Sequence, residues 1–123
     1  MNKIDNKLDK AWSVLVKLRA GGYCEYCGST RALNSHHIFT RAKRSVRWDL
    51  NNGICLCAGH HIGNKFSAHK TPVPFSVWII SKRGADWYNL LNAKSNQVSK
   101  LHTFEKEIIL KELNDKIKQY ELP

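Results

Sequence analysis

The sequence lacks a long apolar run at any position. None of its 123 residues belongs to a stretch of the roughly 18 to 20 apolar residues that a membrane span requires. The first ten residues, MNKIDNKLDK, contain no apolar segment of the kind found in a signal peptide. We therefore expect a soluble, cytoplasmic protein with no membrane partner. The length fits one compact domain that spans residues 1–123.

Acidic residues are scarce, and they are scarcest in the middle of the chain. Lys and Arg total 20 against 10 for Asp and Glu, a formal net charge of +10. Residues 26–85 carry nine basic residues and a single acidic one, Asp49. Because neighbouring positive charges repel one another unless a negative charge offsets them, this segment is expected to attract a polyanion, most simply nucleic acid. The alternative is a solvated basic face with no partner.

Apolar periodicity predicts a helix near the N-terminus. Leu8, Trp12 and Leu15 recur at i, i+4 and i+7, which is typical of an amphipathic helix over about residues 5–20. Residues 23–62 have no helical periodicity. This stretch is expected to form loops and short strands organised around metal.

The C-terminal part of the chain is expected to be helical from about residue 74 to residue 121, with a break at Gly84. Residues 92–99 have a linker-like composition. Thr103 is expected to cap the last helix, which carries an apolar stripe. The stripe consists of Phe104, Ile108, Leu113, Ile117 and Tyr120. It is expected to pack on the parent domain, with dimerisation as the alternative.

Four cysteines without a secretion signal favour metal ligands over disulfides. Cys24 and Cys27 form a CxxC pair, and Cys57 and His60 repeat the same spacing. Together they would complete a tetrahedral, structural zinc site of three thiolates and one imidazole. Cys55 competes with Cys57, because residues two apart on a strand share a face. The spacing favours Cys57, which leaves Cys55 as a small buried hydrophobe.

A second group of potential ligands remains once the zinc site is complete. It comprises His36, His37, Asn52, His61 and His69. Adjacent histidines on an extended chain point to opposite sides, so one can ligate a catalytic metal while the other faces the substrate. No carboxylate cluster offers an alternative metal site. The pattern indicates metal-assisted hydrolysis, in which an imidazole takes a proton from water. A surface His pair with no function is the alternative.

Several separated motifs occur in a characteristic order. They are the CxxC of Cys24 and Cys27, SHHIF at 35–39, WDLNNGICLC at 48–57 and AGHH at 58–61. This order resembles the HNH endonucleases of the ββα-metal class, most of all small phage-type members with a zinc knuckle. The resemblance covers about residues 23–78. It implies an α+β fold, a small ββα-metal core with a structural zinc site flanked by N- and C-terminal helices.

The resemblance also implies roles for individual residues. His37 matches the general base that activates water, and His36 matches the first metal-ligand position. Asn52 matches the central Asn, which fixes the loop carrying the base or helps position the metal. His61 matches the final His, a metal ligand. The implied catalytic ion is Mg²⁺ or Mn²⁺, and the implied products carry a 5′-phosphate and a 3′-hydroxyl.

Two positions depart from the family pattern. His60 stands where Cys is common, a conservative exchange for Zn²⁺. Lys65 stands where many members have His or Asn, and a protonated lysine cannot ligate. His69 and Asn64 are the candidates to replace it. If the chain were helical from His61 to His69, the two imidazoles would lie about 12 Å apart along the axis, so joint ligation requires a bend.

Basic residues follow the expected general base closely. Arg41, Arg44 and Arg47 recur every three residues, and guanidinium groups offer paired donors to phosphate. Arg41, nearest to His37 in sequence, is expected to contact the scissile or adjacent phosphate. General DNA contacts are expected from Lys43, Arg44, Arg47 and Lys65, and plain electrostatic steering is the alternative.

These expectations combine into a metal-dependent HNH DNA endonuclease or nickase that acts on double-stranded DNA. A non-catalytic, zinc-stabilised DNA-binding module is the main alternative, and a ribonuclease or toxin built on the same motif is a third. One nuclease centre cuts one strand. Cutting both strands would therefore require a homodimer, two successive nicks or a partner protein, such as a phage protein.

Overall fold

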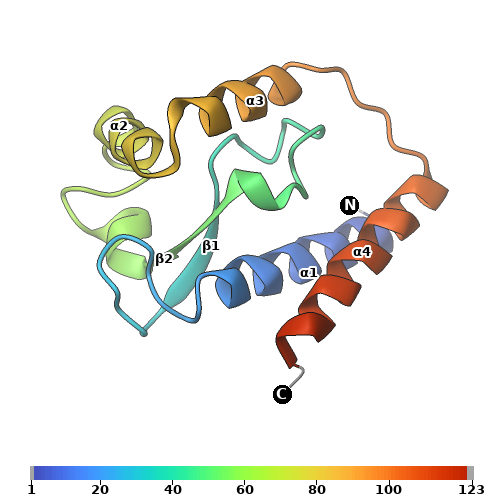
Figure 1. Cartoon of the computed structure of the whole chain (residues 1–123), viewed down its shortest axis with the longest axis horizontal. Coiled ribbons are helices and arrows are strands. Elements are labelled where there is room, and N and C mark those ends of the chain that lie inside the picture. The colour runs from blue at the N-terminus through green and yellow to red at the C-terminus, as the bar shows by residue number, and fades with distance from the viewer. Residues whose placement is uncertain (1, 122–123) are drawn as a thin grey trace.

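The computed structural model describes residues 2–121 and has an α+β fold, as expected. Figure 1 shows a central hairpin with helices on either side. In chain order the elements are α1 (Lys3–Arg19), β1 (Leu33–His37), the 3₁₀ turn η1 (Leu50–Asn52), β2 (Gly53–Cys57), the π-helical turn η2 (Gly59–Gly63), α2 (Pro72–Arg83), α3 (Ala85–Ser95) and α4 (Thr103–Glu121). Within residues 2–121, no helix has the length and apolar character needed to cross a membrane.

The hairpin of β1 and β2 divides the molecule into two apolar cores. The strands are antiparallel, in a register that pairs Leu33 with Cys57 and His37 with Gly53. Successive side chains of β2 point to opposite faces. Cys55 belongs to the core formed with α1 and α4, whereas Ile54 and Leu56 belong to the core formed with α2. The expectation of loops and short strands over residues 23–62 is confirmed.

Helix α1 begins two residues before its expected start. The Asn2 side chain accepts a hydrogen bond from the Asp5 backbone N–H at 2.9 Å, so Asn2 is the N-cap. Leu8, Trp12 and Leu15 are buried, which confirms the predicted apolar face. Helix α1 also leaves no room for a side chain at position 53, because a Cβ on Gly53 would lie 2.9 Å from the Trp12 ring.

Helix α4 packs on α1, which confirms packing on the parent domain, but only part of the predicted stripe is buried. Leu113 and Ile117 face the core. Phe104 and Ile108 stay exposed, at 63% and 54%, because α4 packs through a neighbouring face that includes the buried Lys106. Thr103 is the first helical residue rather than the cap, and the backbone N–H of the preceding residue donates to Glu105 at 3.3 Å.

Helices α2 and α3 meet at Gly84, the predicted break, where φ is +98°. Helix α2 begins at Pro72, two residues earlier than expected, since proline is well suited to the first turn of a helix. Helix α3 continues to Ser95, so the predicted linker over residues 92–99 was wrong for its first half.

Candidate metal centres

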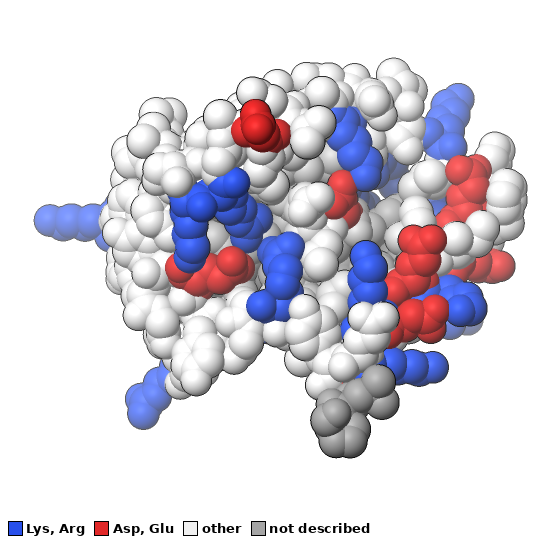
Figure 2. Space-filling model, in the orientation of Figure 1, with Lys and Arg blue, Asp and Glu red and all other residues white. Residues whose placement is uncertain are grey.

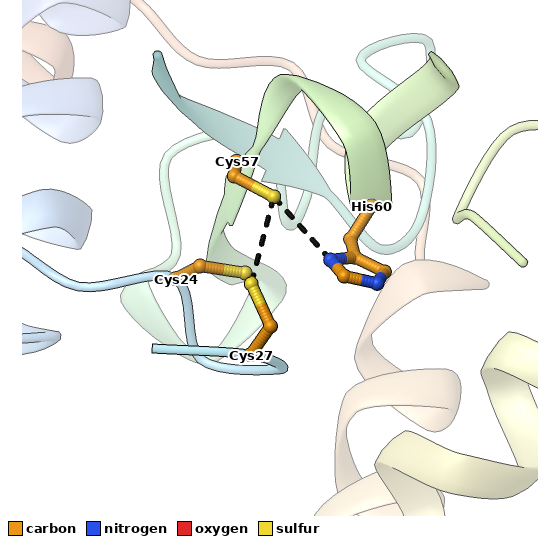
Figure 3. A group of neighbouring side chains, drawn as sticks. All are labelled: Cys24, Cys27, Cys57 and His60. Atoms are coloured by element: carbon orange, nitrogen blue, oxygen red, sulfur yellow. Dashed lines mark hydrogen bonds between the residues drawn. The ribbon is translucent and has the colours of Figure 1, made fainter. Parts of the chain in front are cut away.

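Cys24, Cys27, Cys57 and His60 converge on one point between the first loop and the end of β2 (Figure 3). The Cys27 and Cys57 Sγ atoms are 3.8 Å apart, and Cys57 Sγ is 3.3 Å from His60 Nδ1. A zinc ion with Zn–S bonds of about 2.3 Å holds tetrahedral thiolates about 3.8 Å apart. The four side chains could therefore hold a metal ion such as zinc.

Glu25, inside the CxxC pair, fixes this loop to the rest of the fold. Its backbone N–H donates to the Cys55 carbonyl at 2.8 Å, and its carboxylate accepts from the Cys55 N–H at 2.7 Å. The other carboxylate oxygen pairs with Arg83 of α2 at 3.2 Å. This role of Glu25 was not predicted from the sequence, because no motif marks a glutamate whose partners lie in distant elements.

Cys55 lies outside the cluster, as expected from the spacing. It is fully buried, and this burial raises the pKa of its thiol to about 11. A thiol held neutral in an apolar core is a small hydrophobe. The interpretation of Cys55 as part of the core is confirmed.

A second cluster consists of His36 from β1, His61 from η2 and His69 from the segment before α2. The Nε2 atoms of His61 and His69 are 3.0 Å apart, and both rings lie edge-on to His36. An ion could be shared by three or more His, Cys, Asp or Glu side chains at two places in the described part of the chain. These are the histidine cluster and the cysteine cluster.

A bend after η2 brings the last histidine back to the cluster. The turn ends at Gly63, and the Ala68 and His69 N–H groups donate to the carbonyls of His60 and His61 at 2.9 and 3.1 Å. The bend that joint ligation requires is therefore present.

The other candidate at this position, Asn64, lies against Gly59. The Asn64 amide packs over the backbone of Gly59, so close that a Cβ there would lie 2.7 Å from Asn64 Nδ2. Lys65 is exposed. Of the two replacements considered from the sequence, the structure brings His69 to His61.

Two of the three imidazoles, those of His36 and His61, have a lowered pKa. Burial, together with the neighbouring His61 and His69, lowers the pKa of His36 to about 3. Burial likewise lowers the pKa of His61 below its ordinary value. A ring that stays neutral at physiological pH keeps a lone pair for an ion. An all-imidazole set fits transition ions such as Zn²⁺ or Ni²⁺ better than Mg²⁺, which prefers oxygen ligands.

His37 points to the opposite side of the hairpin from His36, as predicted for adjacent strand residues. Its ring stacks on Trp12 of α1, with centroids 3.8 Å apart and planes 9° from parallel. Its Nε2 lies 2.9 Å from the Arg47 carbonyl. Because a carbonyl only accepts, Nε2 carries the proton, and Nδ1 carries the lone pair in the neutral ring. Burial also lowers the pKa of His37, which favours that neutral base.

Asn52 is fully buried beneath the loop that joins the strands. Its Oδ1 accepts from the Phe39 N–H at 2.7 Å, and its Nδ2 donates to the carbonyls of Phe39 and Val46 at 2.9 and 3.1 Å. Of the two roles that the resemblance allows, these contacts match fixing the loop next to His37.

Arg47, which was predicted to contact DNA, is instead buried against α1. Its side chain is only 5% exposed, and its Nε and Nη2 donate to the two carboxylate oxygens of Asp9 at 3.0 and 2.7 Å. Trp48 Nε1 also donates to Asp9 at 2.8 Å. Burial opposes ionisation of Asp9, but the hydrogen bonds from Arg47 and Trp48 outweigh it and lower the pKa of the carboxyl.

The charge count from the sequence also missed how α1 neutralises the basic segment. Arg41 and Arg44, both about half exposed, lie 3.3 Å from Asp9 and 3.7 Å from Asp5 of that helix. Lys43, like Arg41 and Arg44, remains accessible to a polyanion. Figure 2 shows acidic side chains lying beside basic ones on the face that it presents.

One cleft of about 660 Å³ is lined by several of the candidate residues. His36, His61 and His69 line it together with His37, Arg41, Asp9 and Trp12. Comparisons with protein-family models, curated proteins and solved structures gave no match. The function is therefore inferred from the side chains in this cleft.

Proposed function

We propose that this protein is a metal-dependent DNA endonuclease or nickase of the HNH type. The observation that carries the proposal is the shared cleft, which is lined by His37 and by the three imidazoles that are placed to hold an ion. A general base next to a metal-binding group is the arrangement needed for metal-assisted phosphodiester hydrolysis. The motifs that resemble HNH endonucleases supply every one of these residues except His69, which takes the place of the usual fourth position.

In this proposal His37 removes a proton from water through Nδ1. The Arg47 carbonyl keeps the ring proton on Nε2, so the lone pair of Nδ1 stays available. Asn52 holds the loop that contains this carbonyl. Arg41 on the cleft wall would donate to a phosphate oxygen when DNA displaces part of its contact with Asp9.

His36, His61 and His69 would hold the catalytic ion. When bound, a divalent cation there would stabilise negative charge on the phosphate and on the leaving 3′ oxygen. The resemblance implies Mg²⁺ or Mn²⁺, whereas the donor atoms favour a later transition ion. The metal requirement is therefore part of the test.

The cysteine cluster would hold a structural Zn²⁺. Its four side chains would occupy all four tetrahedral positions around the ion, and they do not line the cleft. Structural zinc sites are closed in this way, with no position left for water or substrate. Exposed cations would bind the DNA backbone. They are Arg41, Lys43, Arg44 and Lys65.

Plasmid nicking tests the proposal. Zinc-loaded protein is incubated with supercoiled DNA and Mg²⁺, Mn²⁺, Ni²⁺, Co²⁺ or EDTA, with His37→Ala beside the unaltered chain. His102→Ala is the matched control, since His102 is an exposed histidine that precedes α4 and does not line the cleft. We expect metal-dependent nicking that falls about 10²-fold or more in His37→Ala and is unchanged in His102→Ala.

DNA-binding assays and an RNA substrate distinguish the alternative functions if the expected DNA nicking is not observed. DNA binding that persists without cleavage in any metal would contradict the proposal and favour a zinc-stabilised DNA-binding module. Cleavage of RNA but not DNA at matched salt would favour a ribonuclease. The ratio of nicked to linear product shows whether the strands are cut singly.

A further inference from the structure

Helix α1 lies outside the hairpin motif, yet two of its side chains reach the surroundings of His37. Asp9 and Trp12 are three residues apart and therefore share one face of the helix. Both line the cleft together with His37. Neither belongs to the motifs on which the family resemblance rests.

The first connection between α1 and His37 runs through the loop between β1 and η1. His37 Nε2 donates to the Arg47 carbonyl, and the Arg47 guanidinium makes a two-point pair with the Asp9 carboxylate. This pair is well shielded, with the Arg47 side chain 5% exposed and the Asp9 side chain 24% exposed. The carboxylate also accepts from the indole of Trp48, the next residue of the loop. The position of the Arg47 carbonyl is thus set against α1.

The second connection between α1 and His37 is a direct contact of their side chains. The Trp12 ring lies parallel to the His37 ring at 3.8 Å, and its Nε1 donates to the Asp49 carbonyl at 2.9 Å. Stacking restrains the tilt of the imidazole, while the hydrogen bond restrains the same loop two residues after Arg47. Asn52 holds this loop from inside, and α1 holds it from outside.

The orientation of the Arg47 carbonyl decides which ring nitrogen of His37 is basic. An imidazole without an acceptor at Nε2 places its proton on either nitrogen. In the tautomer with the proton on Nδ1, that atom has no lone pair for a water molecule in the cleft. The loop between β1 and η1 consists of turns with local backbone hydrogen bonds, such as that from the Arg47 N–H to the Arg44 carbonyl. The contacts with α1 add a long-range restraint on the same carbonyl.

We propose that Asp9 is a positioning residue for His37, which keeps the imidazole proton on Nε2 by fixing the Arg47 carbonyl against α1. Its catalytic consequence rests on the proposed nuclease function, whereas the tautomer itself can be measured without any activity. Asp9→Asn is the direct perturbation. Both carboxylate oxygens accept hydrogen bonds, so an amide would turn one of them into a donor that faces another donor.

Asp5→Asn is the matched control. Asp5 lies one turn earlier on the same helix and is 3% exposed; it pairs with Lys106 of α4 at 2.8 Å and with Arg44 of the loop at 3.7 Å. It therefore offers the same substitution in a buried ion pair that does not involve the Arg47 guanidinium. Long-range ¹⁵N–¹H correlation spectra of the zinc-loaded full chain at pH 8, without DNA, report the tautomer of each histidine.

We expect His37 to show the Nε2–H tautomer in the unaltered chain and in Asp5→Asn. In Asp9→Asn its two nitrogen shifts should move together, as for a mixture of tautomers, and the rate constant for nicking should fall about tenfold or more with little change in KM. Arg47→Lys should reproduce the shift, because an ammonium keeps the charge but not the two-point geometry. Arg47→Lys also replaces Asp9→Asn as the test variant if Asp9→Asn does not fold.

The contrary results separate the two proposals. A His37 tautomer that is unchanged in Asp9→Asn and Arg47→Lys, or shifted equally in Asp5→Asn, would overturn the positioning role. The absence of nicking by the unaltered chain would overturn the nuclease proposal alone, and the spectra would still decide whether Asp9 sets the tautomer.

Discussion

The two clusters that could hold a metal ion place neighbouring histidines in different surroundings. His60 joins three cysteines in a four-ligand set outside the cleft, whereas His61 joins two imidazoles that line the cleft. Both histidines lie in η2, where successive side chains point in different directions. Ligand number and softness separate the two clusters: four ligands including thiolates close a site, and three imidazoles leave a position for water or substrate. The residue type alone does not distinguish them.

The largest effect is expected from removing a ligand of the cysteine cluster. Cys57→Ser should lose bound zinc and destabilise the protein by about 5 kcal/mol or more, because structural zinc binding contributes directly to folding. Zinc content by mass spectrometry and thermal unfolding with and without a chelator check this.

Cys55→Ala is the control two residues away on the same strand. It should keep the full zinc content, since Cys55 lies in the core and outside the cluster. Equal zinc loss in both variants would remove the distinction between the two cysteines and with it the proposed ligand set.

A substitution at each of the neighbouring histidines sharpens the comparison directly. His61→Ala should reduce nicking about 10²-fold or more while zinc content and thermal stability change little, because His61 belongs to the open cluster. His60→Ala should instead weaken zinc retention and lower the melting temperature. Nicking rates, zinc content and melting curves of the two variants are the measurements. The same profile for both would show that the clusters are not separate.

A smaller effect is expected from Asn52, which holds the loop that joins the strands. Asn52→Ala would leave the Phe39 N–H and the carbonyls of Phe39 and Val46 without their buried partner. We expect a loss of about 2 to 4 kcal/mol in the free energy of unfolding, measured by urea titration, with zinc content unchanged. A loss of zinc together with this destabilisation would tie Asn52 to the cysteine cluster instead of to the loop.

Much of the candidate site could be predicted because it depends on local spacing. Cys24 and Cys27 on one side, and Cys57 and His60 on the other, are each three residues apart, and the structure brings the two pairs together. The opposite directions of His36 and His37 follow from the pleat of a strand. The position of His69 was left open, because the bend after η2 depends on backbone hydrogen bonds that no sequence pattern marks.

The misplaced residues are those whose partners are far away in sequence. Arg47 and Asp9 lie 38 residues apart, and a count of charges within one segment cannot reveal a pair between segments. The same limit explains α4. Its apolar residues allow more than one packing face, and the buried pair of Lys106 with Asp5, 101 residues apart, fits a face that excludes Phe104.

An ion held by the cysteine cluster would also affect how the hairpin forms. An ion bound there would join Cys27 to Cys57 and close a loop that contains β1, Asn52 and the whole segment between the strands. Closing such a loop restricts the unfolded chain and lowers the entropy lost when the hairpin forms. A chain that holds an ion there would therefore form the hairpin, and with it the contact between His37 and the Arg47 carbonyl, at a smaller entropic cost.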